Sequence, residues 1–316
     1  MITDVRNYYK PFEYQIAFDF YKDQHRAHWL ADEVPLASDL NDWKLKLTES
    51  EKSLIGNILK SFAQTEVHVN DYWSTKVSVW FPKPEIQAMA RVFADFESIH
   101  AEAYARLNEE LGLDDFKAFL EDEVSKAKIE RLIETPGETI EDRAVSLAIF
   151  SAFTEGVNLF SSFAVLMSFQ LRNLMKGTGQ IVEWSVRDES LHSKAGCWLF
   201  RTLLEEQPEL NTDELREKIA EACNLSVQLE FDFIDKAFEM GSVEGLNKEQ
   251  LKNFIKARAN EKMIELGYKS IYNDIDPNLL KQIEWFGHLT SGKTQQDFFA
   301  GRVTNYSKST ADWDDL

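Results

Sequence analysis

Two stretches of the chain carry a glutamate three residues before a histidine. The first pairs Glu97 with His100, and the second pairs Glu189 with His192. On an α-helix, residues at i and i+3 lie on the same face, so each pair could bind one metal ion. An acidic chain with 6 histidines is expected to contain one such pair by chance. A metal site therefore requires further ligands elsewhere in the sequence.

Two more glutamates, Glu66 and Glu155, stand in stretches of apolar and small residues that contain few lysines or arginines. A buried carboxylate is costly unless it is paired or binds a metal ion. The order along the chain is then Glu, Glu-x-x-His, Glu, Glu-x-x-His, as in ferritin-like bundles that bind two iron or manganese ions. We therefore predict a dinuclear metal site with the ligands Glu66, Glu97, His100, Glu155, Glu189 and His192.

Four long helices are expected to position these ligands, because apolar residues recur every three or four positions along each of them. A capping box begins the first helix at Thr48, and prolines at positions 82 and 84 separate it from the second. A Gly-Thr-Gly sequence at 177–179 separates the third helix from the fourth. The predicted ranges are 48 to about 80, 84–111, 139–175 and 180–204.

The rest of the sequence also favours helices, because glycine and proline are few (13 and 7) and no stretch predicts a convincing strand. We expect a connection at 29–47. We predict an all-α fold, with a ferritin-like helical bundle over residues 1–289 and the metal site in its four-helix core. A flexible C-terminal tail is expected at 290–316. The further predicted helices cover 11–28, 114–135, 211–241 and 247–266.

The composition argues against several kinds of partner. The chain has 54 acidic and 35 basic residues and a net charge of −19, which disfavours nucleic acid and anionic membranes. The N-terminus lacks the apolar core of a signal peptide, and the longest apolar region, 159–169, is too short to span a bilayer. Cys197 and Cys223 imply no disulfide framework. We expect a soluble protein of the reducing cytoplasm.

Three further residues accompany the predicted ligands. Tyr104 follows His100 by four residues, Asp188 directly precedes Glu189, and Trp29 lies well upstream. With these residues, nearly the whole chain resembles the radical-generating small subunit of class I ribonucleotide reductase. The resemblance implies that Tyr104 matches the tyrosine that bears a radical. It also implies that Trp29 hydrogen-bonds to Asp188, an aspartate that lies behind the metal ligands.

The resemblance implies a mechanism. The two oxidised metal ions store a one-electron oxidising equivalent, which resides on Tyr104 or on the ions themselves. It then travels through His100, Asp188 and Trp29 to a cysteine in a separate catalytic large subunit, which reduces the ribonucleotide for deoxyribonucleotide synthesis. Tyrosine and tryptophan are the oxidisable side chains, while aspartate and histidine fix proton positions and ligand orientation. Cys197 does not form a substrate-reducing dithiol pair with Cys223, which lies 26 residues away.

The C-terminus also fits this family, whose members dock on the large subunit through a flexible tail with acidic residues and a terminal apolar residue. This chain ends in Asp312-Trp313-Asp314-Asp315-Leu316. Tyr306 is the best candidate for a radical relay in the tail, and Trp313 is its rival. The family also implies a homodimer.

The ligands suit iron or manganese, because they combine carboxylates with one imidazole per ion and include no thiolate. Glu66 stands where many family members have aspartate, which resembles the manganese–iron and dimanganese subgroups. The first of these replaces the radical tyrosine by phenylalanine, whereas this chain keeps Tyr104. We expect two ions per chain, with dimanganese favoured and diiron or manganese–iron as alternatives. One departure is Asn70, because dimanganese members carry lysine at this position.

Two other functions stay open on the sequence. A ferritin-like ligand-binding oxidase would use a tyrosine five residues before the third glutamate, where this chain has Phe150. A non-enzymatic iron-storage protein would be about half as long and would not need Trp29, Asp188 or a docking tail. A metal site alone would suit either function.

Overall fold

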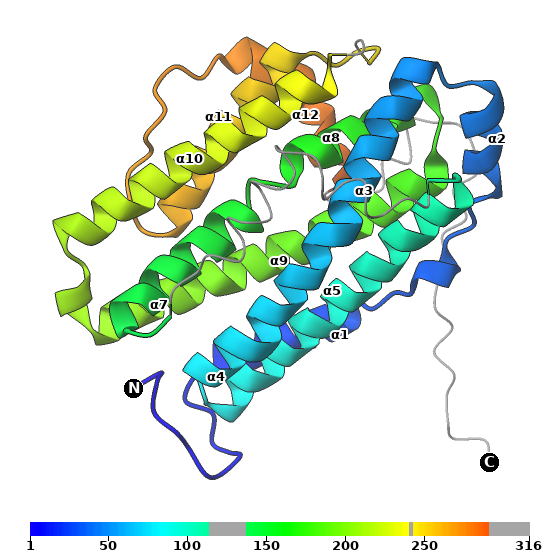
Figure 1. Ribbon diagram of the computed structural model, residues 1–316. Coiled ribbons are helices and arrows are strands. Elements are labelled where there is room, and N and C mark those ends of the chain that lie inside the picture. Colours follow the sequence, from blue (N-terminus) through cyan, green and yellow to red (C-terminus); the bar gives the residue numbers. More distant parts are fainter. Residues whose placement is uncertain (114–136, 240–242, 291–316) are drawn as a thin grey trace, which may run out of the picture.

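The computed structural model describes residues 1–113, 137–239 and 243–290, and it confirms the all-α prediction. The only β-type pairing among these residues is an isolated bridge between Val243 and Leu246. Long helices run side by side through the molecule (Figure 1). The helices that carry the predicted ligands are α3 (Glu49–Asp71), α5 (Pro84–Glu110) and α9 (Lys176–Glu206), with a broken helix between α5 and α9.

Helices α3 and α5 pack side by side. Each begins where its sequence signal predicts. The hydroxyl of Thr48 accepts a hydrogen bond from the backbone N–H of Glu51, whose carboxylate accepts one from the backbone N–H of Thr48. Helix α3 passes into a π-helical segment, η2 (Tyr72–Val77), and ends in the short α4 (Ser78–Trp80). Pro84 occupies the first turn of α5. Helix α1 (Gln15–Arg26) packs along α5 and α9 and begins four residues after the expected start at residue 11.

The prediction of one unbroken helix over 139–175 is wrong. The structure has α7 (Ile140–Leu147), the π-helical η4 (Ala148–Thr154), a turn, α8 (Phe160–Ser168) and a 3-10 turn, η5 (Phe169–Arg172). The backbone N–H of Glu155 bonds to the carbonyl of Phe150, which widens the helix just before the predicted ligand. The guanidinium of Arg258 donates to the carbonyl of Gly156 and so satisfies backbone freed by the break.

The expected connection at 29–47 contains a helix, α2 (Ala37–Leu45). The buried carboxylate of Asp39 on α2 accepts hydrogen bonds from the backbone N–H groups of Gly177 (2.9 Å) and Thr178 (2.7 Å). These are free donors in the first turn of α9, so Asp39 stabilises the start of that helix. Helix α9 therefore begins at Lys176, and the Gly-Thr-Gly sequence lies inside it.

Three further helices cover η4 and α8 on the side away from α3 (Figure 1). They are α10 (Asp213–Ala237), α11 (Lys248–Glu265) and α12 (Pro277–Thr290). The first two agree with the predicted ranges 211–241 and 247–266, and no helix was predicted where α12 lies. The helix or pair of helices predicted at 114–135 and the tail after Thr290 lie outside the described residues.

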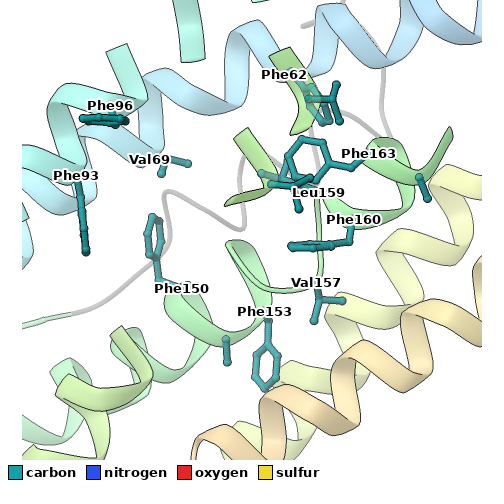
Figure 2. Packing of buried hydrophobic residues seen from close by; sticks show 14 of the residues in the cluster. Phe62, Val69, Phe93, Phe96, Phe150, Phe153, Val157, Leu159, Phe160 and Phe163 are labelled. Carbon is teal, nitrogen blue, oxygen red and sulfur yellow. The ribbon is translucent and has the colours of Figure 1, made fainter. Parts of the chain in front are cut away.

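Phenylalanine rings fill the space between the helices that carry the predicted ligands (Figure 2). Phe62 from α3 packs against Phe163 from α8, with ring centroids 5.1 Å apart. Phe93 and Phe150 are equally buried in the same core. Each fully buried ring contributes about 1.5–3 kcal/mol relative to exposure. No helix in the described part of the chain combines the length and the apolar character needed to cross a membrane.

Candidate metal centre

The structure brings the six predicted ligand side chains together in the middle of the bundle. All six are buried, with at most 1% of any of these residues exposed. They form two sets whose ligand atoms lie within 4.8 Å of one another, and both sets include Glu97 and Glu189. Two shared carboxylates between two ligand sets are the arrangement of a site for two neighbouring ions. The first set adds Glu66 and His100, and the second adds Glu155 and His192.

Both imidazoles present the same nitrogen to the carboxylates. Nδ1 of His100 lies 3.2 Å from Glu97 Oε2 and 3.1 Å from Glu189 Oε1. Nδ1 of His192 lies 2.7 Å from Glu97 Oε1 and 3.4 Å from Glu155 Oε2. Because His100 follows Glu97 by three residues on α5, the two side chains lie on one face of that helix. The facing helix α9 brings Glu189 to His100, and α5 brings Glu97 to His192.

The other ring nitrogen of each histidine faces away from the carboxylates and has a polar partner. Nε2 of His100 lies 3.3 Å from Asp188 Oδ2, and Nε2 of His192 lies 3.0 Å from Gln24 Oε1. The amide of Gln24 also donates to Asp188 Oδ1 at 3.1 Å, which links the two histidines through one chain of hydrogen bonds. Partners of this kind fix the tautomer and orientation of metal-binding histidines.

Gln24 was not among the predicted site residues, although the sequence carries a signal for it. It lies on the buried face of α1 with Ala17 and Phe20, at a spacing that otherwise selects apolar residues. A polar side chain on such a face requires a hydrogen-bond partner inside the protein.

Trp29 contacts Asp188 as the resemblance implies, and its indole N–H donates to Asp188 Oδ2 at 2.8 Å. The indole also stacks on the ring of His100, with centroids 5.8 Å apart. Burial raises the pKa of Asp188, but His100, Arg187 and Trp29 outweigh this effect and hold the pKa below its usual value. Asp188 is therefore a charged acceptor at neutral pH.

Tyr104 lies on the same face of α5 as Glu97 and His100, and it is fully buried. Its phenol donates a hydrogen bond to Ser185 Oγ on α9 at 2.8 Å, and its ring packs against Phe62, with centroids 4.8 Å apart. Burial, followed by the charge of Glu66, raises the pKa of Tyr104 well above 10. Ser185 was not predicted as a site residue.

Trp73 is a third residue that the sequence reasoning missed. Its indole N–H donates to Glu155 Oε1 at 2.7 Å, and its ring lies 6.1 Å from that of His192. A buried indole N–H needs an acceptor, but nothing near Trp73 in the sequence indicates which one.

The chemistry of the site fits bound cations. Both oxygens of Glu66 are buried and accept no hydrogen bond from any residue that the structure describes. Burial and the negative charge of Glu97 raise the pKa of both Glu66 and Glu189 well above the usual value. Burial alone also raises the pKa of Glu97, but His192 and His100 lower it to about 2. Metal ions would relieve the crowding of these carboxylates and satisfy their oxygens.

A buried carboxylate–histidine site for two ions in a helical bundle defines a protein of the ferritin-like dinuclear metal class. The family model described as "Ribonucleotide reductase, small chain" matches residues 6–278. The chain is 34% identical to a probable ribonucleoside-diphosphate reductase small subunit of Invertebrate iridescent virus 6, covering 96% of this chain and 94% of that protein. It is 31% identical to the ribonucleoside-diphosphate reductase small chain of Variola virus, covering 94% and 90%.

Two solved structures show the same fold. One is the ribonucleotide reductase R2 subunit from Clostridium botulinum, with a TM-score of 0.77, 20% identity, and coverage of 87% of this chain and 88% of that one. The other is Streptococcus sanguinis dimanganese(II)-NrdF, with a TM-score of 0.75, 21% identity, and coverage of 87% and 100%.

The chain therefore belongs to the ribonucleotide reductase small-chain family, the small subunits of class I ribonucleotide reductase. As a small subunit of ribonucleoside-diphosphate reductase, it works together with a large subunit. The match along nearly the whole chain favours this function over a ligand-binding oxidase or an iron-storage protein.

Proposed function

We propose that this small subunit binds two manganese or iron ions at its six carboxylate and histidine ligands. When bound and oxidised, the ions supply a one-electron oxidant for ribonucleotide reduction in the large subunit. The observation that carries this proposal is the pair of ligand sets that share Glu97 and Glu189. The hydrogen-bonded group of His100, Asp188 and Trp29 supports it, because it leads away from that site.

The residues of the chain have separate roles in this proposal. Glu97 and Glu189, which belong to both ligand sets, would help to hold both ions, and each histidine would contribute its Nδ1 to one of the two sets. Asp188 holds His100 in the tautomer with the proton on Nε2 and accepts the indole proton of Trp29 when that ring is oxidised. The phenylalanine core excludes water, which protects a stored oxidant.

We favour manganese over iron at both positions. Support comes from Glu66 in place of aspartate and from the fold of the dimanganese protein of Streptococcus sanguinis. Asn70 stands against it, because it donates to Ser98 Oγ at 2.9 Å and supplies no positive charge there. Diiron and manganese–iron centres are the alternatives. Metal analysis of protein purified from cells grown with both metals decides among them.

The tail at 290–316 is our candidate for docking on the large subunit, with Tyr306 as the relay residue and Trp313 as its rival. These residues after Thr290 lie outside the described part of the chain. Deletion of 306–316 should abolish ribonucleotide reduction while metal content stays the same. Tyr306→Phe and Trp313→Phe then identify the relay, because phenylalanine is not oxidised in the tyrosine or tryptophan range.

Two further properties complete the proposal. We place the protein in the reducing cytoplasm, since both of its cysteines are free and burial raises the pKa of Cys197 and Cys223 to about 12. We also propose a homodimer, as the family implies. Light scattering of the full-length protein should give twice the mass of one chain.

One experiment tests the whole proposal. The purified protein should bind about two manganese or iron ions per chain, and Glu97→Ala should abolish this binding. Ribonucleotide reduction should appear only when the large subunit is added. Unchanged metal content in Glu97→Ala contradicts the ligand assignment, and reduction without the large subunit contradicts the division of labour.

A further inference from the structure

A groove of about 580 Å³ lies between α3 and α5, the neighbouring helices of Figure 1, and it reaches the metal site. Glu66 from α3 and Glu97 from α5 line it, and both are buried. Val67 and Glu109 also line it, and both are exposed. The groove therefore joins two ligands in the core of the bundle to the surface of the protein.

The wall of the groove on α5 is a row of residues spaced four apart. These residues are Glu97, Ala101, Ala105 and Glu109. Residues at this spacing lie on one face of a helix, and a rise of about 1.5 Å per residue makes the row about 18 Å long. The two alanines in the middle of the row keep the groove open, because a methyl group fills little of the space between two helices.

The charged residues that line the groove are all acidic. Glu102 and Glu109 are exposed, whereas Glu66 and Glu97 are buried. None of the described residues that line the groove is a lysine or an arginine. Arg106, on the same stretch of α5, donates to a backbone carbonyl group and does not line the groove. A cleft whose charges share one sign concentrates ions of the opposite sign and speeds their entry.

The buried end of the groove offers oxygens that a cation can bind. Both carboxylate oxygens of Glu66 are buried and accept no hydrogen bond from any described residue. A buried carboxylate without a partner is costly, so it favours a cation that reaches it. Nearby, the amide of Asn70 donates to Ser98 Oγ at 2.9 Å, which ties α3 to α5 without adding a charge.

The second ligand set lies away from the groove. The ring of Phe93 lies 4.2 Å from that of His192, and neither residue lines the groove. Glu155 does not line it either. Glu66 and Glu97 are thus the predicted ligands that a cation in the groove can reach, and Glu97 belongs to both ligand sets.

We propose that this groove is the route by which divalent cations enter the metal site, with Glu102 and Glu109 attracting the cation at its mouth. The cation passes from them to Glu66 and Glu97. Because Glu97 belongs to both ligand sets, it hands one of the two ions on to the second set. This inference rests on the proposed function, because it concerns how that function acquires its metal ions.

The rate of metal uptake tests the route. Full-length protein is freed of metal with a chelator and mixed rapidly with Mn(II). The electron paramagnetic resonance signal of free Mn(II) then falls as the protein binds it. Glu102→Gln/Glu109→Gln keeps the size of both side chains but removes their charge. We expect uptake to slow by about 10-fold at low salt, the lower end of the effect of electrostatic steering.

Salt and final metal content give two further readouts for this variant. The difference in rate from wild type should shrink at about 1 M salt, where exposed charges are screened beyond about 3 Å. The final metal content should stay at about two ions per chain, because neither Glu102 nor Glu109 belongs to a ligand set.

Two other variants separate charge from shape. Asp95→Asn/Glu110→Gln removes two charges from exposed positions of α5 that do not line the groove, so uptake should keep the wild-type rate. Ala101→Leu fills the middle of the groove without changing its charge. It should slow uptake at every salt concentration and leave the final metal content at about two ions.

The outcomes separate this inference from the proposed function. Uptake at the wild-type rate in both groove variants overturns the inference and leaves the proposed function intact. Equal slowing in Asp95→Asn/Glu110→Gln also overturns it, because the net charge of the protein would then explain the effect. So does a lower final content in Glu102→Gln/Glu109→Gln at an unchanged rate. Wild-type protein that takes up neither Mn(II) nor Fe(II) overturns the proposed function, and the inference falls with it.

Discussion

Trp29 and His100 share one oxygen of Asp188. The indole N–H of Trp29 lies 2.8 Å from Oδ2, and Nε2 of His100 lies 3.3 Å from the same oxygen. The two rings also stack, with an interplanar angle of 26°. In the proposed function, a proton and an electron would therefore leave Trp29 in different directions, the proton to Asp188 and the electron through His100.

The first prediction concerns the N–H of Trp29. Trp29→Phe keeps an aromatic ring in the core but removes the donor and the oxidisable indole. We expect metal content to stay at about two ions per chain. Ribonucleotide reduction should fall by about 100-fold, the upper end of the loss in activity when a residue that supports a metal ligand is replaced. Trp184→Phe is the control, since Trp184 packs on Trp29 with centroids 5.2 Å apart. Equal losses in both variants would point to packing alone.

The second prediction concerns Gln24, which bonds to both His192 and Asp188. Gln24→Leu keeps the volume but leaves Nε2 of His192 without its acceptor. We expect metal affinity to fall by about 10- to 100-fold, measured by competition with a chelator. Gln15→Leu is a matched control on the same helix, because the exposed side chain of Gln15 donates a hydrogen bond to Asp19 and does not contact the site. Unchanged affinity in Gln24→Leu would refute the role of Gln24.

The third prediction is that metal binding releases protons. Burial and neighbouring carboxylates raise the pKa of Glu66 and Glu189, and the charge of Glu97 raises the pKa of His192 to about 10 despite its burial. Metal ions bind carboxylates and neutral imidazoles, so these groups must lose their protons first. Metal affinity should therefore rise with pH. Calorimetry in buffers of different ionisation enthalpy measures the number of protons released. Glu97→Ala, which should not bind the ions, gives the background heat.

The same pKa shifts predict how the metal-free protein responds to pH. A group whose pKa is higher in the folded state than in the unfolded state binds more protons when folded, in the window between the two values. The free energy of unfolding of the metal-free protein should therefore fall as pH rises above the ordinary carboxylate range. His192 should add to this fall from its ordinary pKa of 6.5 up to about 10, where the folded protein loses this proton too. Urea unfolding at several pH values measures this. A stability that rises over the first window would contradict the shifts of Glu66 and Glu189.

The clustering of Glu97 with His100 and of Glu189 with His192 could be predicted, because each pair follows the period of a helix and the structure keeps both helices. Gln24, Trp73 and Ser185 could not be matched with their partners, because those partners lie 81 to 168 residues away in the chain. The turn that breaks the helix after η4 could not be predicted either. Every residue from Ala148 to Ser168 is buried, so no change in the polar and apolar pattern marks the π-helical segment or the turn.

The last prediction tests how closely α9 approaches η4 behind the metal site. A Cβ at Gly196 would lie 1.8 Å from Ser151 Oγ and 2.3 Å from Ser151 Cβ. Gly196→Ala should therefore push η4 away from α9 and displace Glu155, which follows η4 directly. We expect a loss of about 1–3 kcal/mol in the free energy of unfolding and weaker metal binding.

The control for Gly196→Ala is Gly287→Ala, because an added Cβ at Gly287 on α12 meets no atom within 4 Å. There the better helix propensity of alanine should stabilise the protein by about 0.5–1 kcal/mol. The double variant Gly196→Ala/Ser151→Gly removes the side chain that the new methyl group meets. It should recover most of the lost metal affinity, since the approach of α9 to η4 is restored. Metal affinity that stays low in the double variant would mean that the contact with Ser151 does not set the position of Glu155.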